Sequence, residues 1–135
     1  MAPVTVLIVD DEASFRAAAR GVVAASPGFD PVGEAASAEE ALETARELEP
    51  DLMLVDLSMP GLDGLETSSR LGAVLPGAVI VLVAVDGGPS PDKRGAQGVS
   101  AFIRRDELTP GALRAIWDEH GRSGALARDQ IDSPP

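Results

Sequence analysis

The sequence predicts an α/β fold, namely a doubly wound, five-stranded parallel sheet with helices on both faces. Short apolar runs alternate along the 135-residue chain with segments that have helical spacing. The apolar runs lack period-two alternation, which is typical of parallel strands that are covered on both faces. Alternating strands and helices favour right-handed crossovers, and in such sheets functional residues gather at the carboxyl ends of the strands, near the switch point.

Each of the apolar runs is short enough to be one strand of the sheet. The second run contains Pro31, which lacks an N–H for the ladder and therefore suggests an edge strand. The strands are predicted at Val4–Val9, Phe29–Ala35, Asp51–Val55, Ala78–Val83 and Val99–Ile103.

The helices are predicted from apolar spacing and from residues that suit helix starts. Ser37 and Glu40 form a capping-box pattern, in which each side chain satisfies the other's backbone N–H. Thr109 is a suitable N-cap, and Pro110 follows it at the first helical position. The helices are predicted at Glu12–Ala25, Ala38–Leu48, Gly64–Leu75 and Thr109–His120.

One connection departs from the alternation. GGPSPDKRGAQ, residues 87–97, has two prolines, three glycines and almost no apolar residue, so the fourth helix of the fold is expected to be short or disordered. The last stretch is polar and ends in Ser-Pro-Pro. We expect one domain over residues 1–121, followed by a polar tail or the start of a linker over residues 122–135.

Composition excludes several classes of function. The net charge of −11 argues against binding of a nucleic-acid backbone by this domain alone. The longest apolar run has eight residues, too few to span a membrane. The chain has no cysteine and no visible secretory signal, so a cytoplasmic location is expected.

Two strands deliver acidic residues to the same edge of the predicted sheet. VLIVDDE places Asp10, Asp11 and Glu12 after the first strand, and DLMLVD ends in Asp56. Adjacent carboxylates repel one another, and in a partly dry site one of them tends to take up a proton unless a cation pairs with them. Asp10, Asp11 and Asp56 therefore form an oxygen-rich pocket suited to a hard divalent cation, most simply Mg²⁺. An aspartate beside such a metal can act as a nucleophile toward a phosphoryl group.

With VLIVDDE, LVDLSMPGLDGLE and GVSAFIRRDEL at this spacing, the chain resembles the receiver domains of bacterial two-component response regulators over roughly residues 3–120. The resemblance implies a flavodoxin-like receiver fold, with Asp56 as the phosphoacceptor. It further implies that Asp11 binds Mg²⁺ directly and that Asp10 holds metal-bound waters. The third protein ligand of the metal would be the backbone carbonyl of Ser58. Glu12 lies where the family tolerates many residues, and a helix first-turn charge is expected there.

Two positions depart from the family pattern. Val83 stands where the fourth strand usually carries a Ser or Thr hydroxyl for a phosphoryl oxygen, and Arg105 replaces the usual Lys. Arginine keeps the positive charge, but valine cannot donate a hydrogen bond. Phe102 matches the aromatic switch position. We therefore expect an intact acid pocket with altered switching.

The resemblance implies a signalling domain without an independent substrate, not an enzyme. Its partners would be a sensor histidine kinase or other phosphodonor and an output domain or effector protein, with a homodimer as a further option. One alternative is a pseudo-receiver, an interaction module that works without phosphorylation. Another is the N-terminal receiver of a longer helix-turn-helix transcriptional regulator. A Mg²⁺-dependent phosphatase ranks last, because Asp56 is not followed by an acid two residues later.

Overall fold

The computed structural model describes residues 2–57, 64–85 and 98–121. The predicted fold class is confirmed: the strands form one parallel sheet in the order β2-β1-β3-β4-β5. Three of the predicted strands are displaced by one or two residues, and Asp56 is thereby the last residue of its strand rather than the first residue after it. The strands are β1 (Val4–Val9), β2 (Phe29–Ala35), β3 (Leu52–Asp56), β4 (Val79–Ala84) and β5 (Ala101–Arg104).

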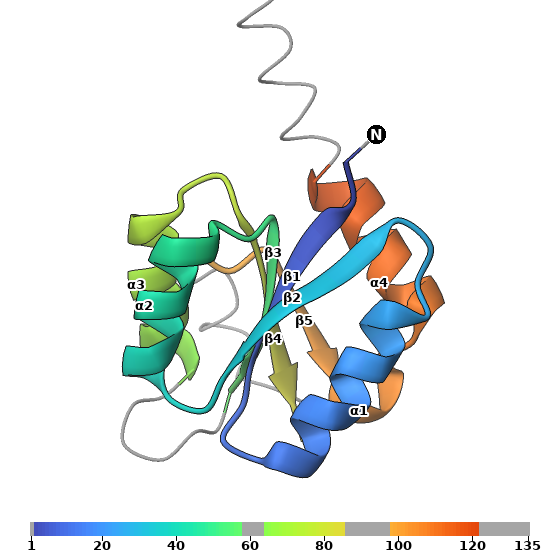
Figure 1. The fold of residues 1–135 in the computed structure, drawn as a ribbon, viewed down its shortest axis with the longest axis horizontal. Coiled ribbons are helices and arrows are strands. Elements are labelled where there is room, and N and C mark those ends of the chain that lie inside the picture. The colour runs from blue at the N-terminus through green and yellow to red at the C-terminus, as the bar shows by residue number, and fades with distance from the viewer. Residues whose placement is uncertain (1, 58–63, 86–97, 122–135) are drawn as a thin grey trace, which may run out of the picture.

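Helices cover both faces of the sheet (Figure 1). The helices α1 and α4 lie on one face, and α2 and α3 lie together on the other. Within the described ranges the chain has no helix long and apolar enough to cross a bilayer. The helices are α1 (Ala13–Ala24), α2 (Ala38–Leu48), α3 (Gly64–Val74) and α4 (Pro110–Ile116), with a 3₁₀ turn η2 (Arg105–Glu107) after β5 and a π-helical turn η3 (Trp117–Gly121) after α4.

The core is divided by the sheet into two apolar clusters. Along β1, Val6 and Ile8 belong to the first cluster, which lies under α1 and α4. Leu7 and Val9 belong to the second cluster, which lies under α2 and α3. Successive side chains of a strand point to opposite faces, so a strand buried on both sides is apolar at every position. This explains why the apolar runs lack alternation.

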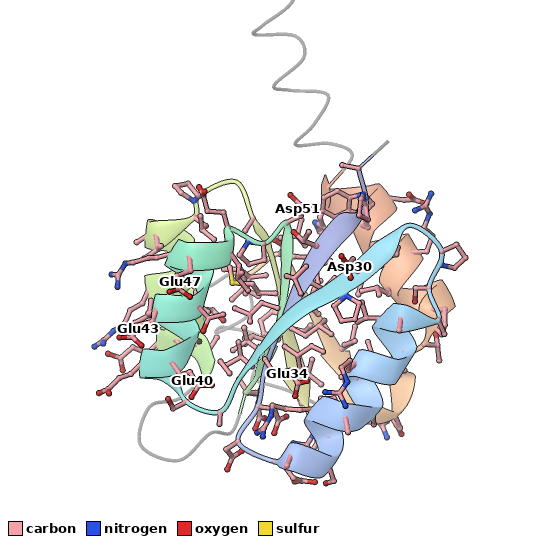
Figure 2. All side chains as sticks on the ribbon, viewed as in Figure 1. Asp30, Glu34, Glu40, Glu43, Glu47 and Asp51 are labelled. Atoms are coloured by element: carbon pink, nitrogen blue, oxygen red, sulfur yellow. The ribbon has the colours of Figure 1, made fainter. Side chains whose placement is uncertain are left out.

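The strand β2 is an edge of the sheet, as Pro31 suggested. Its register with β1 shifts at this point: Val6 lies opposite Pro31, and Leu7 lies opposite Gly33. Proline cannot donate to the ladder, and an irregularity of this kind is a usual accompaniment on an edge strand. Beyond this strand the surface is acidic: Figure 2 shows the labelled glutamates of α2 pointing outward.

Helix starts follow the predictions, with one difference in α2. The Ser37 hydroxyl accepts from the Glu40 backbone N–H at 3.1 Å, which is half of the predicted capping box. The Glu40 carboxylate, however, accepts from the Ala36 N–H at 3.3 Å. Thr109 caps α4 by accepting from the Ala112 N–H at 3.1 Å.

The final helix is shorter than predicted, because its last turn widens. Regular α-helix ends at Ile116, and η3 continues the chain to Gly121. The Trp117 indole packs directly over Gly121, where an added Cβ would lie 2.4 Å from the ring. The wider turn and the missing side chain make room for the indole. Trp117 is partly buried against the first core cluster.

Two predictions about the organisation of the chain fall on residues that the structure does not describe. They are the short or disordered helix at residues 87–97 and the polar tail at residues 122–135.

Candidate phosphoacceptor and metal site

The predicted acidic residues come together at the carboxyl edge of the sheet. Asp10 follows β1, Asp11 comes next, and Asp56 ends β3; each offers a carboxylate oxygen, and these oxygens lie within 4.8 Å of one another. Asp10 is fully buried, Asp56 is 3% exposed, and Asp11 is exposed. Two of the three acids are thus enclosed by protein, and the third faces solvent at the rim.

Strand pairing and the loop after β1 fix Asp10 in place. Val9 pairs with Val55, so the next residues, Asp10 and Asp56, lie side by side at the carboxyl edge of the sheet. The Asp10 N–H donates to the Ala35 carbonyl at 3.0 Å, and one Asp10 carboxylate oxygen accepts from the Glu12 N–H at 2.8 Å. Asp10 is therefore held by both its backbone and its side chain.

Arg16 also holds the loop after β1 in place, although no sequence motif predicted this role. Its Nη1 donates to the Asp10 carbonyl at 2.7 Å, while its Nε donates to Glu34 of β2 at 3.2 Å. The side chain is only 20% exposed. Arg16 thus ties the loop that carries the acids to the edge strand.

The pocket is electrostatically unfavourable for its own charges. Burial raises the pKa of Asp10, and the neighbouring charges of Asp56 and Asp11 raise it further. The Glu12 N–H and the Arg105 guanidinium oppose this rise. Since positive charge stabilises ionised Asp10, the cluster is suited to cations.

Arg105 supplies one such positive charge. It is the first residue of η2, and its Nη2 lies 3.0 Å from Asp10 Oδ2 and 3.8 Å from Asp56 Oδ2. Burial opposes its charge, but Asp10, Glu12 and Asp56 outweigh that effect and raise the pKa of Arg105. The structure therefore brings the residue at the usual Lys position into the acid pocket.

Glu12 has a different surrounding from the one predicted. It occupies the N-cap position of α1 rather than its first turn, and its side chain makes no capping hydrogen bond. Its carboxylate instead lies 3.3 Å from Arg105 Nη1 and accepts from the Ser14 hydroxyl at 3.0 Å. The hydrogen bond from Ser14 is the largest cause that lowers the pKa of Glu12, and the hydrogen bond and charge of Arg105 lower it further.

The two predicted switch residues lie on opposite faces of the sheet. Val83 pairs with Asp56, and its carbonyl accepts from the Leu57 N–H at 3.0 Å. Its side chain is 1% exposed and belongs to the first core cluster. Phe102 pairs with Leu82 and packs, half-buried, against the second cluster. Ser58, the predicted backbone ligand, lies outside the described residues.

Comparisons with known proteins identify the family of this domain. Residues 6–106 match the response regulator receiver domain family. The chain is 37% identical over 118 residues to the nitrate/nitrite response regulator protein NarL of Escherichia coli, covering 84% of this chain and 53% of NarL. It is 42% identical over 120 residues to a protein-glutamate methylesterase/protein-glutamine glutaminase of Anaeromyxobacter dehalogenans, covering 89% of this chain and 34% of that protein.

A solved structure gives the same result for the fold. The response regulator domain of Thermotoga maritima CheB superimposes with a TM-score of 0.75 at 26% identity, covering 86% of this chain and 95% of that domain. The chain spans about half or less of the length of the two curated relatives, at 53% and 34%. The similarity therefore concerns one domain of those proteins.

Proposed function

Because the chain belongs to the response regulator receiver domains of two-component signalling systems, we propose that Asp56 accepts a phosphoryl group in a Mg²⁺-dependent transfer. The donor would be a sensor histidine kinase or a small phosphodonor. One observation carries the proposal: Asp56 ends β3 with its carboxylate beside those of Asp10 and Asp11.

The donor set fits Mg²⁺. Three carboxylates within 4.8 Å of one another provide the hard oxygen ligands that this ion prefers. Asp10, Asp11 and Asp56 would hold the ion, and the Ser58 carbonyl is proposed as a further ligand. When bound, the ion neutralises charge on the carboxylates and on the incoming phosphoryl group.

The transfer itself requires little from the protein beyond position and charge. An Asp56 carboxylate oxygen attacks phosphorus, and the bond from phosphorus to the donor's leaving atom breaks as that atom keeps the electron pair. The product is an acyl phosphate on Asp56. Arg105 lies within reach of the same carboxylate, so its guanidinium would pair with the phosphoryl oxygens.

The response to phosphorylation is proposed to be altered. Val83 lies opposite Asp56 with its side chain in the core, and it has no hydroxyl to offer a phosphoryl oxygen. A hydrogen bond to a charged group contributes about 1.5–3 kcal/mol, so its absence weakens coupling between the acyl phosphate and β4 by roughly tenfold or more. Phe102, on the other face, would respond only through the backbone of β5.

We place the domain at residues 1–121, with residues 122–135 as a tail or linker. Support for this boundary comes from α4 and η3, which lie beyond the family match and pack against α1 and β4. The domain would act as a signalling module rather than an independent enzyme, in the cytoplasm, and pass its state to an output domain or effector protein. With a net charge of −11, nucleic-acid binding would belong to such a partner.

A pseudo-receiver is the second candidate. Two observations favour it, namely that Arg105 already pairs with Asp10 and that Val83 is an ordinary core residue. In that case the domain would keep one conformation and bind its partner without phosphorylation.

Intact-mass spectrometry distinguishes the two candidates. The chain is incubated with acetyl phosphate in the presence and absence of Mg²⁺, beside Asp56→Asn and the control Asp30→Asn, an exposed position on β2. Gain of one phosphoryl group that needs Mg²⁺ and Asp56, but survives Asp30→Asn, supports the receiver. No gain from folded protein, with acetyl phosphate and with a histidine kinase donor alike, supports the pseudo-receiver.

A further inference from the structure

The Arg105 guanidinium contacts a carboxylate outside the three predicted aspartates. Besides Asp10 and Asp56, its third carboxylate neighbour is Glu12, at 3.3 Å from Nη1. Glu12 lies outside the group of three acids that could share a metal ion. Arg105 therefore bridges the proposed metal ligands and a carboxylate next to them.

An aromatic ring completes the surroundings of Arg105. The guanidinium carbon lies 4.4 Å from the centroid of the Phe15 ring. Phe15 is on the face of α1 that packs against the first core cluster, which restricts movement of the ring. A guanidinium over an aromatic face is attracted by the ring's quadrupole, and a partly dry site strengthens that attraction.

The Arg105 side chain is mostly enclosed as a result. It is 23% exposed, and its Nε is buried without a hydrogen-bond partner among the described residues. The two Nη atoms contact carboxylates, Nη2 those of Asp10 and Asp56 and Nη1 that of Glu12. The planar fork of arginine can serve both sides at once, which a compact ammonium group could not do in the same way.

We infer that Glu12 and Phe15 are positioning residues that hold Arg105 against Asp10 as the resident counter-ion of the pocket, so that a divalent cation binds only by displacing Arg105 from Asp10. The inference rests on the proposed function in one respect, namely that the three aspartates bind a divalent cation. After a cation has displaced it from Asp10, the Arg105 guanidinium would stay beside Glu12 and the Phe15 ring, from where it could return to Asp10.

The physical basis is competition between two positive charges for the Asp10 carboxylate. Asp10 Oδ2 cannot lie 3.0 Å from a guanidinium nitrogen and also serve a cation at full strength, because two positive charges at that spacing repel. Whatever stabilises Arg105 in the pocket therefore weakens cation binding. A change at Phe15 tests this without altering any charge.

The experiment is isothermal titration calorimetry of the full 135-residue chain with Mg²⁺. Arg105→Gln is expected to bind Mg²⁺ at least about tenfold more tightly than the parent. Phe15→Leu is expected to bind about threefold more tightly, whereas Phe15→Tyr keeps the aromatic face and the parental affinity. Arg104→Gln is the matched control, since Arg104 is exposed and pairs with Asp106 at 2.8 Å; its affinity should stay within about twofold of the parent's.

Glu12 needs a double-mutant cycle, because Glu12→Gln also removes a charge that attracts Mg²⁺. The variant is compared in the parent and in Arg105→Gln. If Glu12 acts through Arg105, its effect on Mg²⁺ affinity differs between the two backgrounds by at least about threefold. Equal effects would remove Glu12 from the inference.

Thermal unfolding without Mg²⁺ provides a second readout. Arg105→Gln should unfold at a lower temperature than Arg104→Gln, because Asp10 then lacks its counter-ion, and added Mg²⁺ should restore more stability to it. The inference is overturned if Arg105→Gln and Arg104→Gln bind Mg²⁺ alike, or if no variant binds it. Mg²⁺ binding with this pattern but no phosphoryl uptake would instead refute the proposed function alone.

Discussion

The two halves of the sheet contribute differently to the carboxyl edge. In the β1–β3 half, three carboxylates lie within 4.8 Å of one another, and Asp10 is fixed by hydrogen bonds on both sides. In the β4–β5 half, Val83 is a core residue that pairs with Asp56 through the backbone, and the Arg105 side chain contacts Asp10 and Asp56. The proposed metal ligands and phosphoacceptor thus belong to the β1–β3 half, and the predicted switch residues Val83 and Phe102 belong to the β4–β5 half.

Under the proposed function, accepting a phosphoryl group and responding to it would be separable properties of one fold. The acids depend on strand pairing between β1 and β3, which the core residues of both strands support. The proposed response would depend on polar contacts at β4 and β5, where Val83 offers no side-chain hydrogen bond. Substitutions in each half should therefore change different measurements.

The largest effect is expected in the acid half, from Asp11→Asn. Even changes in the partners of metal ligands cost 10–100-fold in affinity, so removing a ligand's charge should weaken Mg²⁺ binding by about 100-fold, or about 2.7 kcal/mol. Asp11 is exposed, so the urea midpoint should stay near the parental value. Calorimetry with Mg²⁺ and urea unfolding test the two statements, with Asp30→Asn as control. An unchanged Mg²⁺ affinity would contradict the proposed ligand role.

The next effect concerns how the chain enters β5. Gly98 has φ +87°, and an added Cβ would lie 2.7 Å from the Ser68 carbonyl oxygen of α3. Gly98→Ala should lower the free energy of unfolding by about 2 kcal/mol. Gly21→Ala in α1 meets nothing within 4 Å and should instead raise it by about 0.5–1 kcal/mol. Urea unfolding measures both, and a neutral Gly98→Ala would show that this approach is not rigid.

The third effect is smaller than that of Gly98→Ala and is expected from Val83→Thr. A hydroxyl in the core beside Asp56 should cost about 1 kcal/mol in the unphosphorylated protein. After treatment with acetyl phosphate and Mg²⁺, the same hydroxyl should strengthen protection of β4 and β5 against hydrogen exchange. Val81→Thr, on the same face and two residues earlier, should destabilise without that gain. If the two variants respond alike, Val83 is not the reason for altered switching.

Much of the fold could be predicted because its signals are local. The bounds of Phe29–Ala35 and Ala38–Leu48 were predicted to the residue. Pro31 indicates an edge strand and Ser37 indicates a helix start, and both features depend on residues close in the sequence. The π-helical geometry at the end of the last helix could not be predicted. Its π-helical turn depends on the Trp117 indole lying over Gly121, a packing arrangement that residue types alone do not specify.

The site follows the same division. Asp10, Asp11 and Asp56 could be brought together from sequence, because parallel strands end at a common edge. The role of Glu12 could not, since its partner Arg105 is 93 residues away and the pairing depends on how α1 and η2 are placed. Arg16 was missed for a similar reason: it contacts the backbone of Asp10 and the side chain of Glu34, and a backbone contact leaves no signature in sequence.

The shift in register at Pro31 also affects how copies of the molecule meet. An edge strand exposes unpaired backbone groups that can recruit a strand from another molecule. Here the outer edge carries a proline without an N–H, an irregular ladder and the acidic side chains Asp30 and Glu34 (Figure 2). The opposite edge, β5, is short and ends in the exposed Arg104. Within the described residues, both edges of the sheet are therefore poor templates for pairing with a strand of another molecule.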